Sequence, residues 1–138
     1  VFLDGRIYGK PSGEEDARSM LKSLAGKTHT VMTGVCIVDL SWHRERFSFS
    51  DASLVTFRPL DDPLIDLYMK RTHVLDKAGA YAVQDSTDTI ISSITGSVWN
   101  VVGFPVERFR ESIKDKDYFS HFDFSFLGRV RPLSDRRI

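Results

Sequence analysis

The feature that most constrains this chain is a pair of long β-forming runs separated by a short polar stretch. Residues 28–39 and 46–57 are rich in β-branched and aromatic residues and show no helical period. The stretch between them, LSWHRE, is polar enough for a hairpin connection. We therefore predict two long antiparallel strands, with Ser48, Ser50 and Thr56 interrupting the alternating apolar face of the second.

The segment before this pair predicts a hairpin and a helix. VFLDGRI places an Asp-Gly turn between two short apolar halves, which is the strongest short hairpin signal. Ser12 and Glu15 have the spacing of a capping box, and apolar residues then recur at helical spacing. We expect a helix over about residues 13–25 that ends at Gly26.

A second helix is expected over residues 60–70. Asp61 or Asp62 is suited to cap its first turn, where Pro63 also fits because its fixed φ suits that position. The buried stripe of this helix is predicted to contain Leu64, Leu67 and Tyr68.

The remaining pattern completes the expected fold. Residues 89–94 predict a strand, and Pro105 is placed to begin a last helix after the apolar segment 99–105. The order β-α-β-β-α-β-α, with an antiparallel pair inside it, indicates an α/β or α+β fold with a mixed sheet flanked by helices. We assign residues 1–114 to one domain and residues 115–138, which are aromatic and basic without a clear period, to a C-terminal extension.

Charge and cysteine content narrow the function. The chain has 19 basic and 19 acidic residues, and this balance gives no support to general nucleic-acid or membrane-surface binding. No apolar run approaches the ~20 residues that span a bilayer. The single cysteine, Cys36, excludes an internal disulfide or a Cys-based zinc site and favours a reducing cytoplasm. Because Cys36 lies in the apolar run VCIVD, we expect it to be buried.

Lys10 is the first candidate binding residue. It follows Gly9 at the exit of the predicted hairpin and precedes a helix N-terminus, whose free N–H groups attract anions. A lysine at such a place can bind a phosphate as a point charge. The alternative is a solvated surface lysine, and the P-loop pattern is absent from the sequence.

The stretch LDKAGAYAVQ supplies two more candidates, Lys77 and Gln84. Its small residues allow the backbone to approach a ligand closely. Lys77 can bind an anion there, and the planar Gln84 amide, with both a donor and an acceptor, suits the edge of a pyrimidine base. The alternative is a turn in which Asp76 and Lys77 pair at the surface.

Metal and hydrolase signatures are weaker. The histidines lack the spacing of a zinc site, and His29, inside a predicted strand, is more simply a structural histidine. No G-x-S-x-G is present, so a hydrolytic triad has no support. The carboxylate pairs Asp61/Asp62 and Asp85/Asp88 are candidates for binding Mg²⁺, although a helix start and a loop explain them better.

Several segments carry a family resemblance in their order and spacing: DGRIYGKP, GKTHTVMTGV, VTFRPL, LDKAGAYAVQ and NVVGFP. Over roughly residues 1–110 the chain is similar to the Maf family of nucleoside triphosphate pyrophosphatases. The resemblance implies the Maf/inosine-triphosphatase-like α/β fold, which is two-lobed around a mixed sheet with a central cleft. It also implies cleavage between the α and β phosphates of a nucleoside triphosphate, with Mg²⁺ or Mn²⁺ as the divalent metal.

Three residues take roles from this resemblance. Lys10 matches the lysine of the family's GKP motif, which contacts the phosphates, and Gln84 matches the glutamine that helps to set base specificity. Lys77 lies in the DKAG segment of the same lobe and is carried over as a further substrate-binding residue. The form DKAGAYAVQ is similar to the branch of the family that prefers dTTP and UTP.

The chain also departs from the family pattern. In the family, a Pro-Arg-Arg segment, a glutamate and an Ala-Asp-Thr motif precede the position of Val1, and that aspartate is the expected general base. We therefore expect residues 1–114 to be the C-terminal two-thirds of a Maf-like domain without its N-terminal segment. Asp85 stands where the family usually has Gly, which leaves the exact base specificity open.

The resemblance favours a metal-dependent pyrophosphatase that acts on dTTP and UTP, with modified pyrimidine nucleotides as further candidate substrates. The alternative is a catalytically inactive nucleotide-binding or interaction domain derived from a Maf protein. The expected partner is the nucleoside triphosphate substrate. A homodimer is the expected assembly, and neither nucleic acid nor a membrane is an expected partner.

Overall fold

The computed structural model describes residues 1–38, 46–85 and 89–114. The predicted connection LSWHRE and the predicted extension 115–138 lie outside the described residues, as does Asp88. The division of the chain into a domain and an extension therefore stays a prediction.

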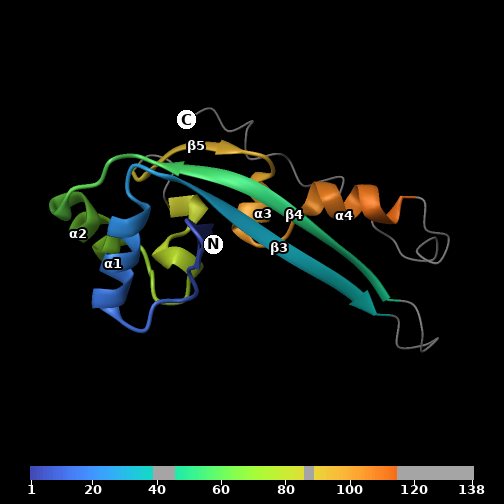
Figure 1. Ribbon diagram of the computed structural model, residues 1–138, viewed down its shortest axis with the longest axis horizontal. Coiled ribbons are helices and arrows are strands. Elements are labelled where there is room, and N and C mark those ends of the chain that lie inside the picture. Colours follow the sequence, from blue (N-terminus) through green and yellow to red (C-terminus); the bar gives the residue numbers. More distant parts are fainter. Residues whose placement is uncertain (39–45, 86–88, 115–138) are drawn as a thin grey trace.

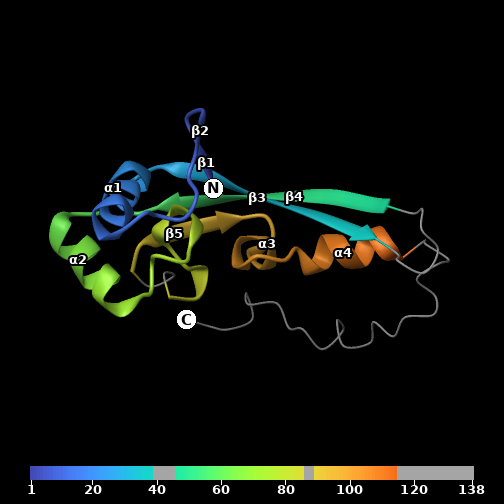
Figure 2. The same ribbon diagram turned by 90° about the horizontal axis from the view of Figure 1, so that it is seen from below.

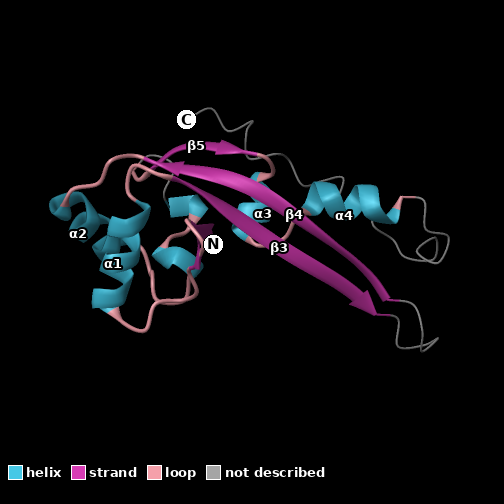
Figure 3. Cartoon of the chain, viewed as in Figure 1, coloured by secondary structure: helices cyan, strands magenta, loops and turns pink. Residues whose placement is uncertain are grey.

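A long antiparallel hairpin forms the centre of the molecule. Its strands are β3 (Thr28–Val38) and β4 (Arg46–Phe57). Thr28 lies opposite Thr56, and the pairing continues without a break to the far end of both strands. Figures 1 and 3 show the hairpin running along the long axis of the molecule. The two strands predicted from the β-branched runs are thus confirmed.

Three shorter strands complete the sheet, which has the order β2-β1-β3-β4-β5. β1 (Phe2–Leu3) and β2 (Arg6–Ile7) form the predicted N-terminal hairpin. Asp4 and Gly5 have φ values of 49° and 80°, the left-handed conformation that a tight two-residue turn requires. β5 (Ile91–Thr95) pairs with β4, and every described pairing in the sheet is antiparallel.

Side chains along β3 alternate between a covered and an exposed face. His29 and Val31 are buried, whereas Met32 is 63% exposed. Cys36 is exposed as well, so the prediction that it is buried is wrong. The apolar neighbours of Cys36 indicate a strand, but the pleat places Cys36 on the same exposed face as Met32.

The first helix, α1 (Glu14–Leu24), confirms the predicted helix but not its capping box. Gly13 is the N-cap residue, and no side chain caps it. Ser12 lies one residue further out, where its backbone N–H and its hydroxyl both donate to Asp16 Oδ2, at 2.9 and 3.0 Å. The predicted pairing with Glu15 is wrong because the helix begins one residue later than the S-x-x-E pattern implies. These bonds from Ser12 hold the pKa of the Asp16 carboxyl below its usual range.

The second helix, α2 (Asp62–Arg71), is capped by Asp61 as predicted. Asp61 Oδ1 accepts a hydrogen bond from a first-turn backbone N–H at 2.9 Å. Its buried residues are Ile65 and Tyr68, while Leu67 is 41% exposed, so the prediction of Leu67 as a buried residue is wrong. Successive positions on a helix differ by roughly 100°, and Leu67 therefore faces away from the side on which Tyr68 packs.

Helices gather in two groups along the hairpin (Figures 1 and 2). α1 and α2 lie at one end, and α3 (Val98–Val102) and α4 (Val106–Ile113) lie toward the other, the latter beginning directly after Pro105 as predicted. The predicted α/β fold is confirmed by this arrangement of an antiparallel sheet with flanking helices. No described helix has the length and hydropathy needed to cross a membrane.

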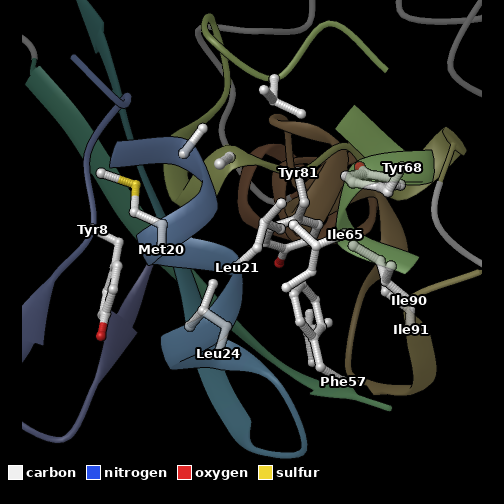
Figure 4. Packing of buried hydrophobic residues seen from close by; sticks show 14 of the residues in the cluster. Tyr8, Met20, Leu21, Leu24, Phe57, Ile65, Tyr68, Tyr81, Ile90 and Ile91 are labelled. Carbon is white, nitrogen blue, oxygen red and sulfur yellow. The ribbon is translucent and has the colours of Figure 1, made fainter. Parts of the chain in front are cut away.

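Two hydrophobic clusters stabilise the helices: α1, α2 and α3 pack on the larger one, and α4 packs in the smaller. The larger is seen from close by in Figure 4, and its labelled members are Tyr8, Met20, Leu21, Leu24, Phe57, Ile65, Tyr68, Tyr81, Ile90 and Ile91. The smaller joins Phe109 and Ile113 of α4 to Phe47 and Phe49 of β4. Because the hairpin contributes to both clusters, it holds the two helical groups in one body.

A buried asparagine fixes α3 to the two strands of the hairpin. Asn100 is fully buried, and its Nδ2 donates to the Val31 carbonyl and to Ser53 Oγ, both at 3.0 Å. Ser53 Oγ in turn donates to the Ser97 carbonyl at 2.8 Å. These bonds tie α3 to both strands of the hairpin, and directional bonds of this kind set the position of the helix more narrowly than apolar contact does.

Candidate functional site

Residues 77–84 form a compact loop beside the main core, here called the site loop. It contains the short 3₁₀ turn η1 (Ala78–Ala80) and the start of a second, η2 (Val83–Asp85). Gly79 and Ala80 have φ values of 72° and 60°, and the left-handed conformation is costly for an alanine. The surrounding structure must therefore hold the site loop in this shape.

The segment that carries Lys10 lies directly against the site loop. The Gly79 backbone N–H donates to the Gly9 carbonyl at 3.0 Å. A Cβ at Gly79 would lie 3.3 Å from Val1 Cγ2 and 3.4 Å from the Tyr81 ring, which is tight enough to favour glycine at a position whose φ already does. This bond brings together two predicted binding segments that are distant in the sequence.

The two predicted lysines differ in their surroundings. Lys10 is exposed and has no ion-pair partner in the part of the chain that the structure describes. Lys77 Nζ donates to Asp76 Oδ2 at 2.7 Å, in a pair that is open to solvent. This hydrogen bond holds the pKa of the Asp76 carboxyl below its usual range. The surface pair considered as the alternative for Lys77 therefore exists here, and an anion would have to compete with Asp76 or bind beside it.

Gln84 lies at the other end of the site loop, in η2, and its side chain is exposed. η2 packs against α3, the helix that Asn100 fixes to the hairpin. The backbone that carries Gln84 is therefore braced, while its amide is available to solvent or to a ligand.

Two tyrosine hydroxyls, on the core side of the site loop, bind it to other segments. The sequence patterns do not predict either of these hydrogen bonds. Tyr68 Oη accepts a hydrogen bond from the Ala82 backbone N–H at 3.1 Å. Tyr81 Oη and His29 Nε2 share a hydrogen bond of 2.8 Å. The only sign of these bonds in the sequence is the tyrosine among the small residues of LDKAGAYAVQ. The residues that bind the loop lie outside this segment, on a helix and on a strand.

His29 and Tyr81 are both removed from water, and this changes their acid–base properties. His29 is 1% exposed and Tyr81 is 6% exposed. Burial lowers the pKa of His29 to about 4, so the imidazole is neutral near pH 7. Burial raises the pKa of the Tyr81 phenol, so its hydroxyl keeps its proton. The prediction of His29 as a structural histidine is confirmed in its burial and its bond to Tyr81, yet Nδ1 has no hydrogen-bond partner in the described structure.

Metal-binding side chains are not clustered in the described residues. Among residues 1–38, 46–85 and 89–114, no group of three or more His, Cys, Asp or Glu side chains could hold a metal ion. Asp61 caps α2, and Asp62 pairs with Lys22 at 2.5 Å, as the helix-start interpretation of these carboxylates expects. The second predicted pair includes Asp88, which lies outside the described residues.

Two pockets of the described surface lie away from Lys10, Lys77 and Gln84. One, of about 300 Å³, lies between α1 and α2 and is lined in part by Arg18, Asp66 and His73. The other, of about 480 Å³, lies between β4 and α4 beside Asp51 and Glu107. Neither is lined by any of the three predicted binding residues.

Comparison with known proteins places the chain, including the site loop, in a family. A family described as Maf-like protein matches residues 1–116. The chain is 45% identical over 115 residues to a dTTP/UTP pyrophosphatase of Phocaeicola vulgatus, covering 83% of this chain and 58% of that protein. It is 46% identical over 116 residues to a protein of the same name from Porphyromonas gingivalis, covering 83% and 57%. A third of that name, from Thermococcus gammatolerans, is 44% identical over 107 residues, covering 78% and 56%. The chain thus spans less than two thirds of the length of these relatives.

The burial of His29 predicts a loss of stability in mild acid. The unfolded histidine has a pKa near 6.5, and in the folded chain it is about 4. Between these two values the unfolded chain binds a proton that the folded chain does not. The free energy of unfolding should therefore fall as the pH is lowered from 6.5 toward 4, by on the order of 3 kcal/mol in total.

Urea unfolding of the chain and of His29→Gln, at several pH values between about 7 and 4, checks this expectation. The slope of stability against pH in this window should be clearly smaller in the variant, where carboxyls with lowered pKa, such as Asp16 and Asp76, account for what remains near pH 4. His73→Gln, at an exposed histidine, is the matched control and should keep the slope. An equal slope in the chain and in His29→Gln would assign the acid sensitivity to other groups.

Proposed function

Since the chain belongs to the Maf family of Maf-like proteins, we propose that the protein is a nucleoside triphosphate pyrophosphatase that acts on dTTP and UTP. The products would be the nucleoside monophosphate and pyrophosphate. Support comes from relatives named dTTP/UTP pyrophosphatase that are 41–46% identical over more than 80% of this chain. The observation that carries the proposal is the hydrogen bond between Gly79 and Gly9, because it unites the lysine-bearing segment and the site loop on one surface.

In this proposal Lys10 binds the triphosphate. Its exposed ammonium can turn toward a phosphate oxygen and acts as a compact positive charge without a fixed direction. Lys77, on the site loop, is proposed as a second cation that binds the triphosphate. In the absence of nucleotide its ammonium pairs with Asp76. Two lysines on adjoining segments suit a polyanion better than a single phosphate, because the charge of a triphosphate is spread over several oxygens.

Gln84 is proposed to bind the base. Uracil and thymine present an N–H donor beside a carbonyl acceptor, and an amide in one orientation matches both. The same amide turned over would match cytosine, which presents the opposite pattern. Selectivity for uracil and thymine through Gln84 therefore requires an amide that is held in one orientation.

The proposed reaction needs a divalent metal, Mg²⁺ or Mn²⁺, which would neutralise phosphate charge and polarise the attacking water. The described residues include no suitable group of ligands, so we assign no ligand and no metal-dependent step to them. We likewise assign the general base to none of them. What the described residues contribute is the binding and orientation of the nucleotide.

We further propose a cytoplasmic location, because a chain with a single cysteine suits a reducing compartment. A homodimer is proposed as its assembly, and neither nucleic acid nor a membrane is proposed as a partner. The molar mass in solution, measured by light scattering after gel filtration, would test the assembly. We expect the mass of a dimer, and the mass of a monomer would contradict the proposal.

The proposed activity is tested by pyrophosphate release from UTP, dTTP and 7-methyl-GTP, measured with this chain and with the full-length product of its gene. We expect release from UTP and dTTP in the presence of Mg²⁺ and little from 7-methyl-GTP. EDTA should stop the reaction, and added Mg²⁺ or Mn²⁺ should restore it. Nucleotide binding without release by the full-length product would favour the alternative of an inactive binding domain. If the full-length product neither bound nor hydrolysed these nucleotides, the proposed activity and the alternative of a nucleotide-binding domain would both be rejected.

Lys10→Ala should lower kcat/KM for UTP by about 100-fold in the active protein, since it removes a charge that stabilises the reacting phosphates. The circular dichroism spectrum should not change, because Lys10 is exposed. Lys114→Ala, which removes an exposed lysine after α4, is the matched control and should leave activity within about twofold. Equal activity of the Lys10 and Lys114 variants would return Lys10 to the status of a solvated surface residue.

Gln84→Ala should reduce the preference for UTP over CTP by about tenfold, with a smaller effect on turnover of UTP itself. Gln84→Glu keeps the size and the acceptors of the side chain but removes the amide donor, so it should lose selectivity as well. The measurement is the ratio of kcat/KM for the two nucleotides. A ratio that is the same in all three proteins would exclude Gln84 as the base-reading residue.

A further inference from the structure

Tyr81 is the side chain through which the site loop enters the core. Figure 4 shows it projecting into the cluster that contains Leu21, Ile65 and Phe57. Its hydroxyl lies 2.8 Å from Nε2 of His29, on strand β3. The bond therefore joins the site loop to the central hairpin across the interior of the protein.

The rings around this bond are locked in orientation. His29 and Phe57 meet edge to face with centroids 5.0 Å apart, and Phe57 and Tyr81 do so at 4.9 Å. His29 and Tyr81 complete the triangle at 5.3 Å. Edge-to-face contacts on two sides restrain the Tyr81 ring, so the position of the phenol and that of its backbone are linked.

The number of hydrogen-bond donors in His29 and Tyr81 indicates that packing alone does not explain why these two polar side chains are buried together. A neutral imidazole has one N–H, and a phenol has one O–H. One hydrogen bond between them uses one of these protons, whichever tautomer is present. The other proton has no acceptor among the described contacts, in agreement with the unpartnered Nδ1 of His29. Two apolar side chains would fill this space without that cost, so the bond is better explained by the direction it imposes.

What the bond directs is the conformation of the loop backbone. Tyr81 directly follows Gly79 and Ala80, the two left-handed residues. The Gly79 N–H reaches the Gly9 carbonyl, and the next residue after Tyr81, Ala82, donates to the Tyr68 hydroxyl. The anchored stretch therefore lies between the two predicted substrate-binding residues of the loop.

We propose that His29 is a positioning residue for nucleotide recognition: its hydrogen bond to Tyr81 holds the site loop in the one conformation that presents Lys77 and Gln84 together beside Lys10. The inference rests on the proposed function. It supplies one restraint that base reading by Gln84 needs, because a backbone held in one place keeps the amide within reach of the same edge of the base. His29 itself does not contact the substrate in this account.

Tyr81→Phe is the sharpest test, because it removes one oxygen and keeps the ring. We expect KM for UTP to rise about five- to tenfold, kcat to change less than twofold, and the preference for UTP over CTP to fall by a similar factor. Leu24→Ala is the matched control, since it disturbs the same hydrophobic cluster but removes no ring contact of His29 or Tyr81 and leaves their bond in place. It should lower Tm but leave the nucleotide preference unchanged. His29→Gln, which keeps a donor and an acceptor, should retain more of the preference than His29→Leu.

Amide hydrogen exchange tests the same inference without substrate. In Tyr81→Phe, exchange at Gly79 and Ala82 should speed up while exchange in the β3–β4 ladder stays the same. Unchanged exchange at these amides, or an active Tyr81→Phe protein with unaltered KM and preference, would overturn the positioning role and leave the proposed function standing. A wild-type protein that neither binds nor hydrolyses UTP would overturn the proposed function. Faster exchange would then still support His29 as the anchor of the loop, and unchanged exchange would reject both.

Discussion

The antiparallel ladder between β3 and β4 is the interaction on which the rest of the structure depends. It pairs the two longest strands over their whole length, and both hydrophobic clusters form against it. One end carries His29 and Val55 into the main core, and the other presents Phe47 and Phe49 to α4. In the middle, Val31 and Ser53 receive the buried amide of Asn100. A single hairpin thereby sets the distance between the larger cluster, on which α1, α2 and α3 pack, and the smaller cluster of α4.

The site loop gains its shape from bonds to distant segments, the hairpin among them, rather than from its own sequence. Its residues are small, two of them adopt left-handed backbone angles, and its 3₁₀ turns are too short to be stable alone. Three bonds to distant segments hold it: Gly79 to Gly9, Tyr81 to His29, and Ala82 to Tyr68. A loop held in this way can keep exposed polar side chains in fixed positions, which recognition of a particular base requires.

Much of the fold followed from local pattern, and part of the candidate site did too. The β-branched runs, the Asp-Gly turn and the Asp61 cap each act over a few residues, and all three are found as predicted. The membership in the Maf family also follows from short segments in a fixed order. Lys10, Lys77 and Gln84 came from those segments, and their roles stay proposals, since exposure and backbone proximity support binding without identifying the ligand. The errors share one cause. Cys36 and Leu67 have the right residue type for burial, but each lies one position away from the face that is covered.

The sequence by itself determined most of the helices and strands and which family the chain belongs to, but it did not predict α3, where only an apolar segment was expected. These properties depend on periodicity, caps and motifs, all of which are read over short distances along the chain. Only the tertiary structure decided which faces are buried and that His29, Tyr81 and Tyr68 form the support of the site loop. The reason is physical: a side chain is buried or bonded according to what lies opposite it, and here those partners are as many as 52 residues apart.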